Sequence, residues 1–164
     1  MLALPTYPNG PGSNVLRRGR RSLAGQVYLI TTTTLGRKPL FADFDIASRA
    51  ARALAAPTLW RSSTLLCWTL MPDHWHAIIE LGSDEVLSER MRIVKGASSI
   101  EANRYRRAVG SVWSSGFHDH ALRHEEDLIG VARYVVANPV RAGLVPRIGD
   151  YPFWDAIWLE ERRG

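Results

Sequence analysis

The spacing of apolar and polar residues predicts four β-strands in this chain. Residues 26–34 (QVYLITTTT) and residues 63–71 are rich in β-branched and aromatic side chains. Residues 74–81 continue this composition after a Pro-Asp turn, and a shorter segment of the same kind lies around residues 117–123. Runs of this type, bounded by turn residues, are typical of strands. We therefore expect a sheet whose second and third strands are joined by a tight turn.

Apolar residues at helical spacing predict the helices between these strands. The first helix spans about residues 43–55, with Asp43 as its N-cap and Pro57 beyond its end. The second is long, covers about residues 85–107, and has Gly96 as a point where it can bend. Its predicted core-facing positions are Val86, Leu87, Met91 and Val94.

A third helix is predicted after the last strand. It begins with the acidic residues 125–127, which favour the positive end of a helix dipole, and stops at Asn138-Pro139, because a residue before proline is pushed out of helical geometry. The order strand, helix, strand, strand, helix, strand, with an added C-terminal helix, indicates an α+β fold of ferredoxin-like βαββαβ type with an antiparallel sheet. We expect one domain over residues 23–164, preceded by a flexible basic leader at residues 1–22.

Charge and composition narrow the classes of function. The net charge of +5 and the pI near 9.9 favour a polyanionic partner. Two arginine clusters stand out, Arg17, Arg18, Arg20 and Arg21 near the N-terminus and Arg104, Arg106 and Arg107 later on; solvated surface charge is the alternative interpretation of each. One cysteine, no apolar run of about 18 residues and no secretory pattern favour a cytoplasmic protein without a membrane span.

Candidate metal ligands lie at the start of the third predicted strand. His74 and His76 flank Trp75, so on a strand both imidazoles point to one face and the indole points to the other. Two neutral imidazoles side by side can hold a divalent ion. The alternative is a pair of ordinary sheet histidines that hydrogen bond to their neighbours.

A second candidate pair lies on the third helix. Tyr134 and Asn138 are four residues apart and share a helix face. The phenol and the amide would then project toward the same surface. Asn138 is equally well explained as a helix cap, and Tyr134 as an amphipathic core residue whose hydroxyl reaches the surface.

Three separated motifs resemble one protein family. They are residues 71–76 (MPDHWH), residues 116–120 (GFHDH) and residues 134–145 (YVVANPVRAGLV), in this order. Together they closely resemble the REP-associated tyrosine transposases, small single-tyrosine transposases of the HUH endonuclease group, related to insertion-sequence transposases. The resemblance extends from about residue 13 to residue 154.

The resemblance implies an active site. His74 and His76 would be metal ligands for Mg²⁺ or Mn²⁺, Asn138 the third ligand, and Tyr134 the nucleophile that forms a 5′-phosphotyrosine link with DNA. Imidazole ligands suit Mn²⁺ somewhat better than Mg²⁺. The implied partner is single-stranded DNA carrying REP hairpins, bound by a monomer or a homodimer. The residues expected to contact DNA are Arg17, Arg18, Arg20, Arg21, Lys95, Arg104 and Arg141.

Several alternatives remain at this point. Glu80 is a weaker candidate ligand on the strand of the histidines, and Tyr105 is a rival nucleophile. A second metal site at His118, Asp119 and His120 ranks below sheet hydrogen bonding or DNA contact. The alternative function is a catalytically idle protein that binds DNA hairpins for regulation; a small-molecule metal hydrolase is disfavoured because no convincing water-activating acid lies near the motif.

Overall fold

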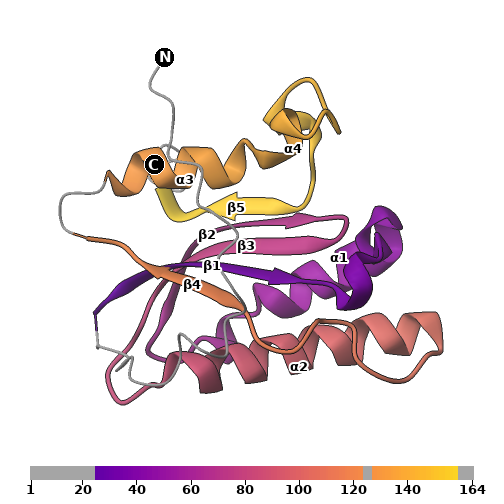
Figure 1. Ribbon diagram of the computed structural model, residues 1–164, viewed down its shortest axis with the longest axis horizontal. Helices are drawn as coiled ribbons and strands as arrows, with labels where there is room; N and C mark the ends of the chain where they lie inside the picture. The colour runs from indigo at the N-terminus through magenta and orange to yellow at the C-terminus, as the bar shows by residue number, and fades with distance from the viewer. Residues whose placement is uncertain (1–24, 124–126, 159–164) are drawn as a thin grey trace.

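The computed structural model describes residues 25–123 and 127–158, which form an α+β fold around one antiparallel sheet (Figure 1). The strands are β1 (Val27–Thr33), β2 (Thr64–Met71), β3 (His74–Glu80), β4 (His118–Ala121) and β5 (Trp154–Ala156). Their order across the sheet is β4-β1-β3-β2-β5, and every neighbouring pair is antiparallel. The predicted α+β class and antiparallel sheet are confirmed.

Helices cover both faces of this sheet (Figure 1). They are α1 (Phe44–Leu54), α2 (Leu87–Arg106), α3 (Leu128–Val136) and α4 (Asn138–Arg141), with short 3-10 turns η1 (Leu35–Arg37), η2 (Leu40–Ala42), η3 (Pro57–Leu59) and η4 (Ile148–Asp150). The helices α1 and α2 pack on one face, and α3 packs on the other against β2 and β5.

The alternation along β3 divides the core in two. Trp75 and Ile79 point into the larger cluster, which contains residues of α1 and α2, and Trp75 is fully buried there. Ile78 points into the smaller cluster with Cys67 and Val135 beneath α3. The same alternation places His74 and His76 on the α3 face of the sheet, because side chains two apart on a strand share a face.

Local signals placed most helix ends correctly. Asp43 is the N-cap of α1, and its carboxylate accepts hydrogen bonds from the backbone amides of Asp45 and Ile46. The helix α2 runs without interruption through Gly96, so no bend forms there. Val86 is the exposed N-cap residue of α2, and its predicted core position was therefore wrong.

The C-terminal segment differs from the prediction in two respects. The helix α3 ends at Val136, just before Asn138-Pro139 as predicted, but Asn138-Pro139 then begins the short helix α4, which was not predicted. Proline is tolerated there because the first turn of a helix does not need its amide hydrogen. The strand β5 was not predicted, since three residues, Trp154–Ala156, carry no recognisable alternation.

None of the helices within the described residues is long and apolar enough to cross a membrane.

Candidate active site

Polar side chains of β1, β3 and β2 form a row on the face of the sheet against which α3 packs. Thr31 on β1 and Thr69 on β2 lie directly opposite His76 on β3, one on each side. Directly opposed residues of antiparallel strands point to the same face. His74 lies in the adjacent row, opposite Thr33 and Met71. The register of the sheet therefore builds a polar patch around the two histidines.

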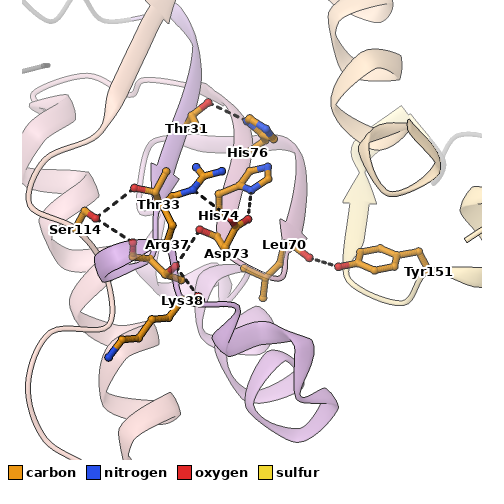
Figure 2. A network of polar contacts seen from close by, with 11 residues as sticks. Thr31, Thr33, Arg37, Lys38, Leu70, Asp73, His74, His76, Ser114 and Tyr151 are labelled. Atoms are coloured by element: carbon orange, nitrogen blue, oxygen red, sulfur yellow. Dashed lines mark hydrogen bonds and ion pairs between the residues drawn. The ribbon is translucent and has the colours of Figure 1, made fainter. Parts of the chain in front are cut away.

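The two histidine rings are neighbours with ordered partners (Figure 2). Their centroids are 4.6 Å apart and the ring planes meet at 79°. His74 Nδ1 lies 2.7 Å from an Asp73 carboxylate oxygen, and His76 Nδ1 lies 2.8 Å from the Thr31 hydroxyl. With Nδ1 of each ring engaged, Nε2 is the nitrogen left to bind an ion, which is the arrangement that orients metal-binding histidines.

The electrostatic environment keeps both imidazoles neutral. Burial, with smaller contributions from the nearby His74, Arg141 and Arg37, lowers the pKa of His76 to about 3. Burial also lowers the pKa of His74, although the Asp73 carboxylate opposes this shift. Neutral imidazole is the form that coordinates a metal ion.

The side chains present fit a metal ion that the two imidazoles hold and that other ligands complete to its full coordination. Over residues 25–123 and 127–158, no group of three His, Cys, Asp or Glu side chains is arranged to hold a metal ion. Glu80 is exposed at the far end of β3, opposite Val27 and Thr64, and it does not join the histidines. Two imidazoles leave positions open for an amide oxygen, water and substrate phosphate, as transition ions such as Mn²⁺ accept.

The other histidine motif lies on β4. His118 stands opposite Thr31 and His120 opposite Leu29, so β4 extends the same face of the sheet. Neither residue belongs to a three-ligand group within the described chain, and a second metal site of that kind is not supported.

Hydrogen bonds from β2 hold the tyrosine helix against this face. The Thr69 hydroxyl donates to the Val135 carbonyl at 3.0 Å, and the Cys67 thiol donates to the Ala132 carbonyl at 3.7 Å. Thr69 is fully buried and is the direct cross-strand neighbour of His76. The C-terminal half of α3, which carries Tyr134, is therefore fixed beside the row that contains His76.

Tyr134 has a cationic partner from α4. The Arg141 guanidinium carbon lies 3.6 Å from the centre of the half-buried Tyr134 ring, and Arg141 Nη1 donates to the Tyr134 carbonyl at 2.5 Å. The charge of Arg141 also reaches His76, whose pKa it lowers. Arg141 therefore links the tyrosine to the histidines, while the contacts of the described residues include no direct bond between the Tyr134 hydroxyl and either imidazole.

Asn138 does not cap α3. Ala137 occupies the C-cap of that helix, and Asn138 is the first residue of α4, where its backbone carbonyl accepts from Ala142. Its side chain is half-buried. The cap interpretation was wrong because the chain re-enters a helix immediately after Ala137.

The remaining predicted residues lie elsewhere. Lys95 donates to the carbonyls of Ser114 and Gly116, which anchors the loop before β4, and Arg104 pairs with Glu101 on the exposed side of α2. Tyr105 also lies on α2, across the sheet from the histidines, and its hydroxyl donates to Asp45. Arg17, Arg18, Arg20 and Arg21 lie outside the described residues.

Three residues of the site were missed by sequence reasoning. Asp73 and Thr31 hold the histidines, and Arg37 in η1 pairs with Asp73 through Nε at 3.1 Å. The position of Asp73 directly before His74 was a usable signal. No pattern in the sequence connected Thr31 or Arg37 with the histidines, because the sheet register places Thr31 and the turn after β1 places Arg37.

Most of the chain matches a known protein family. The model of the family described as "Transposase IS200 like" matches residues 24–138 of the chain. The chain therefore belongs to the IS200-like family of tyrosine transposases, which are HUH enzymes.

Named relatives agree with this assignment. A REP-associated tyrosine transposase of Escherichia coli K12 is 32% identical over 89 residues, which is 52% of this chain and 50% of that protein, so the match spans about half of the relative's length. A protein of Haemophilus influenzae described as a putative REP-associated tyrosine transposase is 26% identical over 140 residues, 79% of this chain and 78% of the relative.

A solved structure shares the fold. It is a REP-associated tyrosine transposase bound to a REP hairpin, with a TM-score of 0.63 and 24% identity, over 82% of this chain and 79% of that one.

Proposed function

We propose that this protein is a metal-dependent single-stranded DNA endonuclease and strand-transferase that acts on REP-type hairpin DNA in the cytoplasm through a 5′-phosphotyrosine intermediate. The carrying observation is the pair of neutral imidazoles, each held at Nδ1, beside the end of the helix that carries Tyr134. Membership of the IS200-like family and the hairpin-bound fold relative support the choice of substrate. The proposal also assigns the strand order β4-β1-β3-β2 to the ferredoxin-like arrangement, with β5 added at the β2 edge.

His74 and His76 would hold Mg²⁺ or Mn²⁺ through Nε2, with Asn138 as the proposed third ligand from the turn after Tyr134. A divalent ion bound there would polarise the scissile phosphate and withdraw charge from it. Asp73 and Thr31 engage Nδ1 of the two rings, which restricts the ring orientations and leaves each Nε2 for the ion. Restricting these rings in advance lowers the entropy cost of assembling the site.

Tyr134 is the proposed nucleophile. Its Oη forms a bond to phosphorus as the bond from phosphorus to the 3′ oxygen breaks; the phenol loses its proton and the departing 3′ oxygen gains one. The products are a 5′-phosphotyrosine link and a free 3′-hydroxyl, and the reverse attack by a 3′-hydroxyl rejoins the strands. A free phenol with a pKa near 10 is a weak nucleophile at neutral pH, so Tyr134 needs local assistance.

Arg141 supplies part of this assistance. Its guanidinium lies over the Tyr134 ring and is bonded to the carbonyl of the same residue, which restricts the ring to one orientation. The remaining proposed DNA contacts are Arg17, Arg18, Arg20, Arg21, Lys95 and Arg104.

Formation of a covalent adduct tests the proposal. The protein is incubated with a REP hairpin oligonucleotide carrying a single-stranded flank and Mn²⁺, and the mixture is run on a denaturing gel. We expect a protein–DNA band that survives denaturation, that Tyr134→Phe abolishes and that the matched control Tyr105→Phe retains. Tight hairpin binding without an adduct would instead identify an idle hairpin-binding protein, and loss of the band in the control alone would assign the nucleophile to Tyr105.

A further inference from the structure

Arg37 occupies an unusual position at the edge of the histidine site. It closes η1, directly after the strand that carries Thr31, and its backbone has a positive φ of 55°. A non-glycine residue rarely adopts this left-handed conformation, and it persists only where the surroundings fix it. The backbone here is held by the hydrogen bond from the Arg37 amide to the Thr34 carbonyl.

The side chain of Arg37 is only partly engaged. Within the described residues its single ion pair runs from Nε to an Asp73 carboxylate oxygen at 3.1 Å. The other Asp73 oxygen receives His74 Nδ1 at 2.7 Å. The two terminal nitrogens of the guanidinium, with four N–H groups, have no partner among these residues, and the side chain is 59% exposed.

The guanidinium lies beside the histidines. Figure 2 shows it next to Asp73 and His74, on the face of the sheet that also carries Thr31 and His76. Its charge is close enough to lower the pKa of both imidazoles. The adjacent Lys38 side chain points away from the histidines in the same view.

A purely structural role does not explain this arrangement. Exposed ion pairs contribute little to stability, so the contact with Asp73 alone gives no reason for an arginine in a left-handed conformation. The contact has a different effect, since it holds the guanidinium at Nε and leaves its terminal nitrogens without a partner among the described residues. A guanidinium presented in this way matches the oxygens of a phosphate.

We propose that Arg37 is a phosphate-binding residue of the site, which contacts a non-bridging oxygen of the DNA backbone at the histidine pair through its terminal nitrogens. Asp73 then holds both the metal-binding His74 and the phosphate-binding Arg37, and sets their spacing. The identity of the ligand as single-stranded DNA rests on the proposed function. The contact itself requires neither the metal ion nor cleavage.

Binding measurements in EDTA test this contact. The Tyr134→Phe protein, which cannot cleave, is titrated with the REP hairpin oligonucleotide bearing a single-stranded flank, with and without Arg37→Gln. We expect Arg37→Gln to weaken binding about tenfold and to reduce the slope of log affinity against log salt by about 0.7, the value for one phosphate contact on a single strand. Lys38→Gln is the matched control, because it removes an equal charge from the next residue and should change neither quantity.

Replacing single phosphates locates the contact. Each phosphate of the flank is changed in turn to an uncharged methylphosphonate. At one position the Arg37→Gln protein and its parent should bind equally, because the partner of Arg37 is already lost; at every other position the tenfold difference should persist. The inference is overturned if the difference in affinity between Arg37→Gln and its parent persists at all positions. It is also overturned if Arg37→Gln loses no more affinity than Lys38→Gln.

The outcomes separate this inference from the proposed function. If Arg37→Gln weakens hairpin binding but the native protein, which keeps Tyr134, forms no covalent adduct, only the enzymatic proposal is contradicted. If the native protein forms the adduct but Arg37→Gln does not weaken hairpin binding, only the inference is contradicted. Absence of any hairpin binding overturns both, and thermal unfolding of Arg37→Gln at the parental temperature excludes a folding defect.

Discussion

At the scale of single residues, the histidine site depends on the groups that hold each ring. Thr31 and Asp73 engage the Nδ1 atoms, and burial keeps both imidazoles neutral. Loss of such a partner of a metal-binding histidine commonly lowers the metal affinity by about 10- to 100-fold. The two histidines are therefore only part of the proposed metal site.

Thr31→Val should weaken Mn²⁺ binding by about tenfold, because the variant keeps the shape of the side chain but removes the partner of His76 Nδ1. Mn²⁺ binding is measured by electron paramagnetic resonance of the free ion. Thr33→Val is the matched control, since Thr33 bonds to Ser114 rather than to a histidine. Equal Mn²⁺ affinities for both variants would show that Thr31 does not orient the ring.

Cys67 predicts a pH dependence of stability. Burial raises the pKa of its thiol from 9.0 to about 12, so the folded state keeps the proton that the unfolded state releases above about pH 9. The stabilisation is complete below about pH 9 and is lost as the pH rises toward 12. In urea titrations at about pH 8 and about pH 10, the native protein should therefore lose more unfolding free energy than Cys67→Ala. Parallel losses in the two proteins would contradict this account.

At the scale of elements, the sheet register decides which side chains become neighbours. The separation in sequence between Thr31 and His76 gave no hint of contact, but their strands place them directly opposite each other. The strand positions, the single face of the histidines and the N-cap of α1 were predictable, because each depends on local periodicity or one capping residue. The strand β5 was not, because it depends on pairing with the distant β2, and the start of α4 at Asn138 was not predicted either.

The bond from Thr69 to the Val135 carbonyl positions α3. Thr69→Val should remove the side-chain donor of that carbonyl and cost about 1 kcal/mol of stability, measured by urea unfolding. Because α3 carries Tyr134, adduct formation should slow. Thr69→Ser, which keeps the hydroxyl, should retain most of the adduct rate. Equal adduct rates for Thr69→Val and the native protein would show that the bond from Thr69 to α3 does not affect catalysis.

At the scale of the whole molecule, the two faces of the sheet have different tasks. The face under α1 and α2 buries Trp75 and most of the large apolar side chains. The face under α3 combines a smaller apolar cluster with the histidines, and the row Thr31, His76 and Thr69 joins the two regions. Stability therefore comes mainly from one face, which leaves the other free to carry polar chemistry.

This division also explains why the rival tyrosine is a poor nucleophile candidate. Tyr105 lies on α2 with the stabilising face, and its hydroxyl is bonded to Asp45, which raises its pKa. Tyr134 lies on the helix that Thr69 and Cys67 attach to the histidine face. The family motif selected Tyr134, and the topology supplies an independent physical reason for the same choice.

The central claim is that Tyr134 attacks a DNA phosphate held at His74 and His76. The most direct measurement is mass spectrometry of the protein after incubation with hairpin DNA and Mn²⁺, nuclease trimming and protease digestion. The account predicts a nucleotide attached through its 5′ phosphate to the peptide that contains Tyr134, and no such peptide from His76→Ala. A nucleotide on any other residue, or an unmodified Tyr134 peptide from protein that has cleaved the hairpin, would contradict it.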